Sequence, residues 1–397
     1  METMGTLSTT PALSGELAQR LRLPATAWLP AQPVPVRFGA GVFAELGQQL
    51  RGRPYVLLTY PQPRFTALAR RLAVGAGQPR QLLDTVRPNP TLADLETLAA
   101  PLRGLGGPTP VLVALGGGSV IDSAKVVAAL AAAPGLELRA LLAQPAAAAA
   151  RAWPVIAVPT TAGTGSEVTP WATVWDPAND RKHSLSRPDL FPELALVDPE
   201  LTLGAPRGLT LQTGLDALSH ALESLWNRNA GPCSSVLAVA AARRVLETLP
   251  RLLENPGDLE LRTRQAEASL LAGLAFAQTR TALAHELSYP LTLRHGVPHG
   301  IACSFTLPQI MQAVIGADAD CDHALAEIFG ADLQAGVATL RRFLRDLGVG
   351  LSPADYGVAE DEWHAIQEAA GQGPRGRNFL AASAADLSFF PNTDPTT

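Results

Sequence analysis

The chain has 397 residues, of which 47% are hydrophobic and 17% are charged, and its formal net charge is −5. This length allows two domains with separate cores, and the composition is that of a soluble globular enzyme. No basic stripe or aromatic-plus-arginine pattern is present, so we expect no nucleic-acid partner. No apolar run reaches the length of about 18 residues that a membrane span needs, and the N-terminus does not resemble a signal peptide.

The three cysteines, Cys233, Cys303 and Cys321, lie far apart in the sequence. They form neither a CxxC pair nor an even disulfide framework. We therefore expect buried structural thiols in a protein of the reducing cytoplasm.

The first half of the chain has an α/β pattern. Residues 1–33 are expected to form a loosely ordered N-terminal arm. Between 34 and 205, short β-rich runs alternate with helical stretches, which predicts a parallel sheet with crossover helices. The predicted strands are YVLLTY (55–60), VLVALGGG (111–118), PVIAVPTT (154–161) and, closing this half, ELALVDPELT (193–202).

The second half, from 206 to 385, is expected to be an all-helical domain, because the β signal disappears after Pro206. Long amphipathic stretches predict helices at 208–229, 234–254, 260–278, 280–291, about 299–315, 321–347 and 358–370. Residues 386–397 are expected to form a C-terminal tail. The predicted fold class is therefore α/β plus all-α.

A glycine-rich loop follows the predicted strand that ends in VLVAL. Gly116, Gly117, Gly118 and Ser119 lead into a helical stretch that carries Asp122. Glycines let the backbone approach phosphate closely, and the N–H groups of a helix start bind anions. The alternative is a simple tight turn. Because the loop is not the GxGxxG fingerprint, we expect a variant of the usual dinucleotide fold.

A second polar cluster lies in PTTAGTGSEVTPWATVWD (159–176). Its small hydroxylated residues, including Thr160, Thr161, Thr164 and Ser166, suit contacts to ribose, phosphate or a nicotinamide amide. Lys182 follows, where a cation could reach ribose or phosphate oxygens. An ordinary polar loop is the alternative interpretation.

Four residues predict a divalent-metal site: Asp216, His220, His285 and His299. Asp216 and His220 are four residues apart and share one face of a helix. Three imidazoles and one carboxylate suit iron(II) or zinc and leave coordination positions open. Each residue alone has a simpler explanation, such as a surface pair, a helix start or a core histidine. The combination is harder to dismiss in a chain with seven histidines.

Together these motifs resemble those of the iron-dependent (group III) alcohol dehydrogenases, a family related to dehydroquinate synthase and glycerol dehydrogenase. GGGSVIDSAK, PTTAGTGSEVT, TGLDALSHALES and the final PHG occur in the family's order, within about residues 34–320. The resemblance implies a Rossmann-like nucleotide-binding domain followed by a helical metal-binding domain, the dehydroquinate synthase-like fold. It also implies NADH or NADPH, one divalent metal (Fe²⁺ preferred, Zn²⁺ as the alternative) and a homodimer.

Carried over by position, the resemblance assigns roles to residues of this chain. The metal ligands fall on Asp216, His220, His285 and His299; the pyrophosphate loop on Gly116 to Ser119; the nucleotide-contacting threonines on Thr160, Thr161 and Thr164; and the cofactor-side lysine on Lys182.

The chain departs from the family pattern at two positions. Tyr289 replaces a second histidine that many members have four residues after the third ligand, and it is a proton donor, a substrate contact or a packing aromatic. His295 lies nearest to this site in the sequence and is the other catalytic candidate. Tyr60 replaces the ribose-binding Asp of NAD-preferring members, with Arg64 nearby, so NADPH should be tolerated.

The segment AHELSYPLTLRHGVPHG is similar to the phosphonoacetaldehyde reductase branch, which acts in phosphonate metabolism and phosphonate natural-product biosynthesis. We therefore expect NAD(P)H-linked reduction of phosphonoacetaldehyde to 2-hydroxyethylphosphonate. Candidate phosphonate contacts are Arg294, Arg375, Arg377 and Asn378, since a guanidinium binds such a group bidentately. The alternative for each arginine is a surface residue in an arginine-rich chain. A dehydrogenase for a neutral or carboxylated alcohol (1,2-diol, butanol or 4-hydroxybutyrate type), a lyase and a non-enzymatic metal-binding protein are the alternatives.

Overall fold

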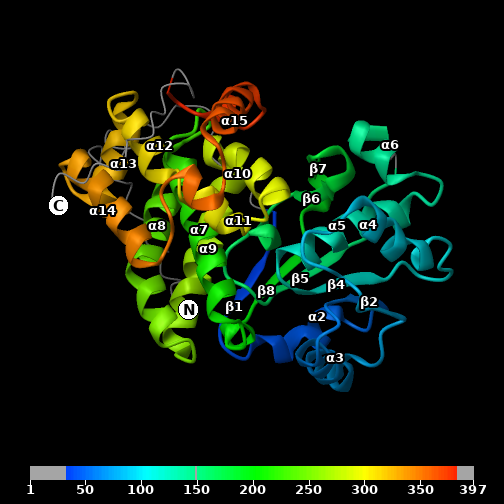
Figure 1. The fold of residues 1–397 in the computed structure, drawn as a ribbon. Coiled ribbons are helices and arrows are strands. Elements are labelled where there is room, and N and C mark those ends of the chain that lie inside the picture. The colour runs from blue at the N-terminus through cyan, green and yellow to red at the C-terminus, as the bar shows by residue number, and fades with distance from the viewer. Residues whose placement is uncertain (1–32, 148–149, 382–397) are drawn as a thin grey trace, which may run out of the picture.

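The structure, a computed structural model, describes residues 33–147 and 150–381 of the chain. Figure 1 shows two halves side by side: a sheet flanked by helices, and a domain made of helices. This arrangement confirms the α/β plus all-α fold class. Residues 1–32 of the expected N-terminal arm and the expected tail at 386–397 lie outside the described residues.

Six parallel strands form the sheet of the first half. They are β1 Val36–Phe38, β2 Tyr55–Leu58, β3 Gln81–Leu83, β4 Val111–Gly116, β5 Val155–Pro159 and β8 Leu194–Val197. Each of the four predicted β runs contains one of these strands, whereas no sequence pattern indicates β1 or β3, which have three residues each.

The strand order is β1-β8-β5-β4-β2-β3, so the chain reverses its direction across the sheet between β2 and β4. In open α/β sheets, ligands bind at the carboxyl ends of the strands at such a switch point. The topology therefore places a ligand site where the chain leaves β2 and β4.

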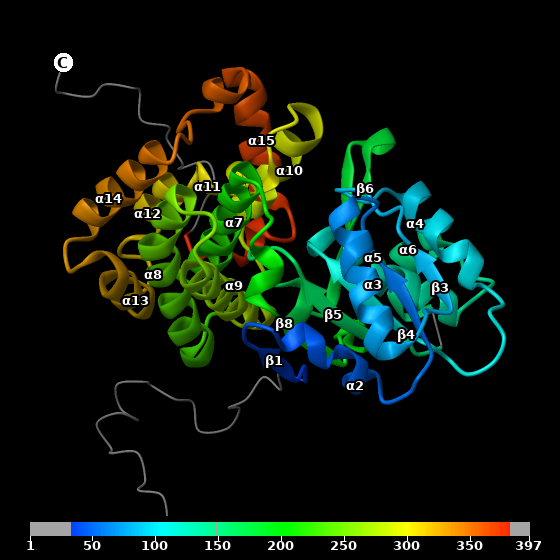
Figure 2. The same cartoon turned by 90° about the horizontal axis from the view of Figure 1, so that it is seen from below.

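Helices cover both faces of the sheet (Figures 1 and 2). Helices α2 (Leu46–Leu50) and α3 (Pro63–Ala76) pack on one face, and α4 (Leu92–Ala99), α5 (Gly118–Ala132) and α6 (Leu138–Ala143) pack on the other. Alternate residues of β2 and β4 point to the two faces, as the pleat of a strand requires. Every residue of β4 is buried, which explains its continuous apolar sequence.

An antiparallel hairpin follows β5, at a place where the sequence indicates a polar loop. Strand β6 (Trp171–Asp176) pairs with β7 (Arg181–Ser186), and Trp175 lies opposite Lys182. The hairpin lies outside the six-stranded sheet and beside α10 of the helical half (Figure 1). It therefore carries Lys182 towards the helical domain.

The second half is helical from Arg207 onward. Its helices are α7 Arg207–Leu225, α8 Pro232–Glu254, α9 Leu259–Thr279, α10 Leu283–Arg294, α11 His299–Ser304, α12 Leu307–Val314, α13 Ala319–Phe329, α14 Leu333–Asp346 and α15 Glu360–Gln372. The single helix expected at about 299–315 is two helices, because Pro308 lacks the N–H that would continue α11. The helix expected at 321–347 is also two, because Gly330 with a φ of 93° ends the first and Asp332 caps the second.

The two parts of the metal motif meet through a close contact between helices. A Cβ atom on Gly300 would overlap the carbonyl oxygen of Gln212 on α7 and would lie 3.3 Å from the Cβ of Asp216. The glycine after His299 therefore lets the start of α11 approach α7. This contact brings His299 next to Asp216.

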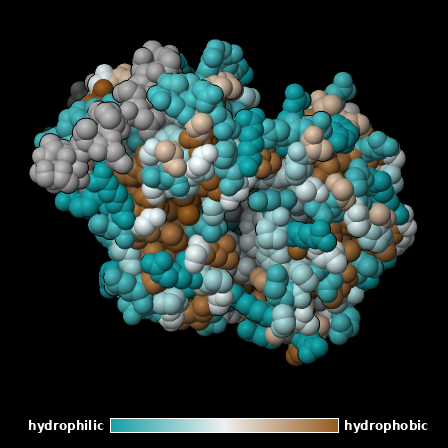
Figure 3. All heavy atoms as spheres, in the orientation of Figure 1, coloured by the Kyte–Doolittle hydropathy of each residue, from teal (hydrophilic) through white to brown (hydrophobic). Residues whose placement is uncertain are grey.

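The surface is hollowed where the two halves meet, as Figure 3 shows. A cavity of about 520 Å³ is lined there by residues of both halves, from Gly118 on α5 to His299 on α11. None of the helices in the described part of the chain combines the length and the hydrophobicity that a membrane crossing requires.

Candidate active site

Asp216 and His220 lie one turn apart on α7 and face the cavity. The Nε2 of His220 lies 3.7 Å from the Oδ1 of Asp216. The Nδ1 of His220 lies 3.3 Å from the carbonyl oxygen of Gly163, and donation to that oxygen leaves Nε2 free to bind a metal. Burial lowers the pKa of His220 to about 4, so its imidazole is neutral at neutral pH, which is the form that binds metals.

His285, on α10, approaches the same carboxylate from a second helix. Its Nε2 lies 3.5 Å from the Oδ1 of Asp216. On the opposite side, its ring Nδ1 contacts Glu223, and its backbone N–H donates to the Oε1 of Glu223 at 3.1 Å. A carboxylate at Nδ1 fixes the tautomer and orients the ring to bind through Nε2.

Glu223 is not among the residues expected from the sequence. It lies on α7 seven residues after Asp216 and therefore on nearly the same helix face. It is fully buried, and its partner is the ring of His285. The spacing of two turns from Asp216 was a signal that could have identified it.

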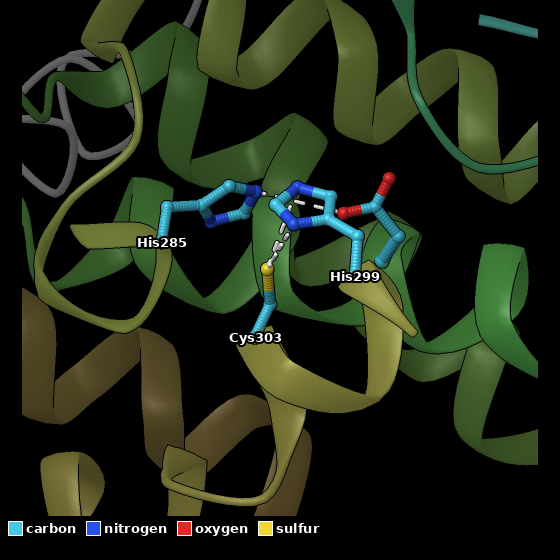
Figure 4. A group of neighbouring side chains, drawn as sticks. His285, His299 and Cys303 are labelled. Carbon is cyan, nitrogen blue, oxygen red and sulfur yellow. Dashed lines mark hydrogen bonds and ion pairs between the residues drawn. The ribbon is translucent and has the colours of Figure 1, made fainter. Parts of the chain in front are cut away.

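His299, at the start of α11, completes the group. Its ring centre lies 5.4 Å from that of His285, and burial lowers the pKa of His299 to about 3. Cys303 follows one turn later on α11, with its Sγ 3.6 Å from the Nε2 of His299. Figure 4 shows the side chains of His285, His299 and Cys303 pointing towards one another. Sequence analysis assigned this cysteine only a structural role.

The residues at this place fit a divalent metal ion. Two buried polar atoms at the centre of the group, the Oδ1 of Asp216 and the Nε2 of His285, have no hydrogen-bond partner within the described residues. Leaving such an atom unsatisfied costs about 1–3 kcal/mol, so native proteins keep it where a ligand satisfies it. Imidazoles and a carboxylate are donors that Fe²⁺ and Zn²⁺ accept.

The glycine loop lies at the carboxyl end of β4 and leads directly into α5. A Cβ atom on Gly117 would lie 3.0 Å from the Oγ1 of Thr161, and one on Gly118 would lie 2.6 Å from the Cγ2 of Thr164. Only glycine therefore lets the loop and the threonine segment pack so closely. The first turn of α5 faces the cavity through Gly118 and Ser119, an arrangement that binds phosphate.

The contact between these two segments begins in the sheet itself. The backbone N–H of Thr160, just after β5, donates to the carbonyl oxygen of Gly116 at 3.0 Å. This bond continues the parallel ladder of β4 and β5 by one residue. The two sequence motifs expected to bind the nucleotide are therefore neighbours at one edge of the sheet.

Asp122 and Ser166, both expected to contact the nucleotide, bind each other. The Ser166 hydroxyl donates to the Oδ1 of Asp122 at 2.5 Å, and the N–H of Thr173 donates to its Oδ2 at 2.8 Å. The buried ammonium of Lys125 donates to the carbonyl oxygen of Ser166 at 2.6 Å. These bonds tie α5 to the hairpin. The geometry therefore favours a positioning role for both residues over direct contact with a cofactor.

Tyr60 follows β2 at the switch point of the sheet and packs against the glycine loop. A Cβ atom on Gly116 would lie 3.2 Å from the Tyr60 ring. Burial raises the pKa of Tyr60 to about 12, and a hydrogen bond with Ser119 partly offsets this effect. The residue therefore presents a neutral phenol beside the glycine loop. Arg64, in contrast, donates to the Leu201 carbonyl.

Two cations flank Tyr289 on the cavity wall. The Nζ of Lys182 lies 3.2 Å from the Tyr289 hydroxyl, and the Arg375 guanidinium lies 5.3 Å from the ring centre. Arg375 donates from Nε to the Oγ1 of Thr281 at 3.0 Å, and the Asn378 amide donates to the Thr281 carbonyl at 2.9 Å. Burial, with the charge of Arg375 as the second cause, lowers the pKa of Lys182 to about 7. Within the described chain, no ion pair neutralises either cation.

Arg294, His295 and Arg377, which were expected to act on the substrate, do not line the cavity, which corrects those three expectations. Arg294 pairs with Asp180 at 2.5 Å on the surface, and the Nε2 of His295 lies 3.1 Å from the Oε1 of Glu362. Arg294 and His295 lie at the C-terminal end of α10, whereas His285 lies near its start. They are close to His285 in sequence, but they do not share its face of the helix. Arg377 is exposed and donates to a backbone carbonyl at the end of α15.

Comparisons with known proteins agree with this geometry. The family model "Iron-containing alcohol dehydrogenase" matches residues 33–199, and "Fe-containing alcohol dehydrogenase family, C-terminal" matches residues 210–387. Phosphonoacetaldehyde reductase of Streptomyces viridochromogenes is 38% identical over 279 residues, 66% of this chain and 70% of that enzyme. Long-chain-alcohol dehydrogenase 1 of Geobacillus thermodenitrificans is 33% identical over 303 residues, 73% of this chain and 75% of that enzyme.

Among solved structures, sulfoacetaldehyde reductase from Bifidobacterium kashiwanohense in complex with NAD⁺ superposes with a TM-score of 0.83. It is 28% identical, and the match covers 91% of this chain and 97% of that one. A second structure, of an iron-containing alcohol dehydrogenase, superposes with a TM-score of 0.79 at 30% identity, over 91% of this chain and 97% of that one.

Proposed function

The chain belongs to the iron-containing alcohol dehydrogenase family, and we propose that it reduces phosphonoacetaldehyde to 2-hydroxyethylphosphonate with NADH or NADPH. Members of the family are oxidoreductases that use NAD(H) and a divalent metal and act on small alcohols or aldehydes. The proposal adds the substrate, a short aldehyde with an anionic head group. It also assigns the enzyme to phosphonate metabolism or phosphonate natural-product biosynthesis.

The observation that carries the proposal is the pair of basic side chains beside the candidate metal site, Lys182 and Arg375, which have no ion-pair partner within the described residues. Both side chains are partly buried, and an anionic substrate would supply the opposite charge that no ion pair provides within the described residues. A guanidinium and an ammonium together suit a phosphonate, which accepts several charge-assisted hydrogen bonds. A neutral alcohol would leave both cations uncompensated. Two similar proteins are named for aldehydes of this kind, phosphonoacetaldehyde and sulfoacetaldehyde.

In the proposed reaction, Asp216, His220, His285 and His299 would hold the metal, and the first turn of α5 would bind the cofactor pyrophosphate. The metal supplies a Lewis acid for the carbonyl, and NAD(P)H supplies the hydride. The remaining task of the chain is to position the aldehyde and to deliver a proton.

Tyr289 is the candidate proton donor. Burial raises the pKa of its phenol, so the group stays protonated at neutral pH. Tyr289 lies between His299, with which its ring stacks at 6.2 Å, and the ammonium of Lys182. From this position its hydroxyl can protonate the alkoxide of the product, and Lys182 then stabilises the phenolate that forms.

A dehydrogenase for a neutral or carboxylated alcohol is the second candidate, because the 33% identity to a long-chain-alcohol dehydrogenase is also substantial. Such an enzyme would keep the metal and nucleotide sites and differ only in what the two cations contact. An enzyme for a neutral alcohol therefore differs from the proposed reductase in its dependence on substrate charge, whereas an enzyme for a carboxylated alcohol differs in the anionic group that the two cations contact.

The test is an NAD(P)H-oxidation assay of protein reconstituted with Fe²⁺ or Zn²⁺. Phosphonoacetaldehyde is compared with 3,3-dimethylbutanal, a neutral aldehyde of nearly the same shape, each with NADH and with NADPH. We expect kcat/KM to favour the phosphonate by roughly 10- to 100-fold, since hydrogen bonds to charged groups are worth about 1.5–3 kcal/mol. Equal or greater efficiency with the neutral aldehyde would support the second candidate in its neutral-alcohol form.

A further inference from the structure

Arg280, which ends α9, has a backbone conformation that glycine adopts far more readily than arginine. Its φ is 65° and its ψ is 177°, a region that is almost closed to residues with a Cβ atom. Helices α3 and α13 end in the same way, at Gly77 (φ 76°, ψ 178°) and Gly330 (φ 93°, ψ 168°). In all three, the backbone N–H of this residue donates to the carbonyl oxygen four residues earlier. Of these three helix ends, only that of α9 carries a side chain.

Hydrogen bonds from buried side chains fix this strained conformation. The Nδ2 of Asn227 donates to the Arg280 carbonyl oxygen at 3.1 Å, and the hydroxyl of Thr279 donates to the same oxygen at 2.8 Å. The hydroxyl of the next residue, Thr281, accepts from the Nε of Arg375 at 3.0 Å. Strained residues persist where the surrounding structure holds them, and they are concentrated at active sites and ligand contacts. The conformation of Arg280 therefore indicates a function for its side chain.

The strained arginine lies at the cavity between the two halves of the molecule. Arg280 lines this cavity, whereas Gly77 and Gly330 do not. One turn earlier on α9, the ring of Phe276 stacks on that of His220, with ring centres 4.1 Å apart. The Arg280 side chain is exposed, and it has no hydrogen bond or ion pair within the described residues. A guanidinium free to bind a ligand is therefore present one helix turn from the candidate metal site.

We propose that Arg280 determines substrate specificity, by binding the anionic head group of the aldehyde together with Arg375. This inference rests on the proposed function and adds a second arginine to the recognition of the phosphonate. Arg375 is hydrogen-bonded to the residue after Arg280, so the two arginines lie on the same part of the cavity wall. A phosphonate has three oxygens and can accept from two guanidinium groups at once. The first turn of α5, which suits the cofactor pyrophosphate, lies on the opposite wall.

Substitution by glycine removes the guanidinium and also relieves the backbone. Metal-loaded Arg280→Gly and wild-type enzyme are compared in kcat/KM for phosphonoacetaldehyde and 3,3-dimethylbutanal, in calorimetric binding of unreactive ethylphosphonate, and in thermal unfolding. We expect kcat/KM for the phosphonate and the affinity for ethylphosphonate to fall by roughly 10- to 100-fold, with little change for the neutral aldehyde. The unfolding temperature should not fall, because glycine favours a φ of 65°.

Arg51→Gly is the matched control for this variant. Arg51 is exposed, ends α2 with a φ of 53° and does not line the cavity. Its substitution also removes an arginine from a position with positive φ, and it should leave all three phosphonate and aldehyde measurements unchanged. An equal effect of the two substitutions on these measurements would overturn the role of Arg280.

The outcomes separate this inference from the function on which it rests. A wild-type preference for the phosphonate in Arg280→Gly, or an equal loss with both aldehydes, would overturn the role of Arg280 and leave the proposed reaction intact. A raised KM for NAD(P)H as the only change would assign Arg280 to the cofactor and also contradict the inference. If the wild-type enzyme binds ethylphosphonate through Arg280 but does not favour phosphonoacetaldehyde, the anion contact stands and the proposed reaction fails.

Discussion

The two walls of the cavity are built from different parts of the chain. On the α/β side, the contact surface is a glycine loop and a helix start, and the polar side chains around it, such as Asp122 and Ser166, bind one another. On the helical side, the surface consists of titratable side chains whose central atoms, in Asp216 and His285, have no hydrogen-bond partner among the described residues. Groups without partners, rather than polar residues in general, therefore indicate where a ligand binds.

The largest effect is expected from removing a member of the helical wall. His285→Ala should lose the bound metal and lower kcat/KM by roughly 10³-fold, the scale seen when a main stabiliser of carbonyl charge is lost. Metal analysis and the reductase assay check this. His323→Ala is the control, since that side chain is 80% exposed on α13. Full metal content and rate in His285→Ala would show that the ligand assignment is wrong.

A smaller effect is expected from the carboxylate behind His285. Glu223→Gln keeps the size of the side chain but removes the charge that orients the imidazole. Metal affinity should fall by about 10- to 100-fold, as is usual when the hydrogen-bond partner of a metal-binding histidine is lost. Competition with a chromophoric chelator measures it. An unchanged affinity would leave Glu223 with a packing role only.

On the opposite wall of the cavity, a substitution in the glycine loop should weaken cofactor binding. Gly118→Ala places a methyl group 2.6 Å from Thr164, so the loop must move away from the threonine segment. We expect NAD(P)H to bind on the order of tenfold more weakly, with metal content unchanged. Fluorescence titration of the cofactor measures the change. Gly135→Ala, whose Cβ meets nothing within 4 Å, should bind normally; if both variants bind alike, the loop does not contact the cofactor.

Helices and strands could be predicted from the sequence where the hydrophobic pattern extends over many residues. The run VLVALG is β4, and the amphipathic stretches gave α7 to α9 within a few residues. The breaks between α11 and α12 and at Gly330 were missed because apolar residues continue on both sides of each break. The hairpin β6–β7 was missed because it lies outside the sheet and only part of it is buried.

For the candidate site, residue spacing along the chain could predict only which side chains share one face of a helix. Asp216 and His220 are one turn apart, and the motif order indicated His285 and His299. Arg375 and Arg377 could not be distinguished, because their directions depend on how the chain packs after α15. The contact between Cys303 and His299 depends on the packing of α11 against α7 and α10. Dimerisation and a cytoplasmic location stay predictions.

The central claim is that Arg375, beside Lys182, recognises the anionic head group of the aldehyde. The most direct measurement is kcat/KM of Arg375→Ala for phosphonoacetaldehyde and for 3,3-dimethylbutanal, with Arg377→Ala as the matched arginine control. We predict a loss of roughly 10- to 100-fold for Arg375→Ala with the phosphonate alone, and little change in the other three measurements. An equal loss with both aldehydes, or an equal effect of both arginine substitutions, would contradict the account.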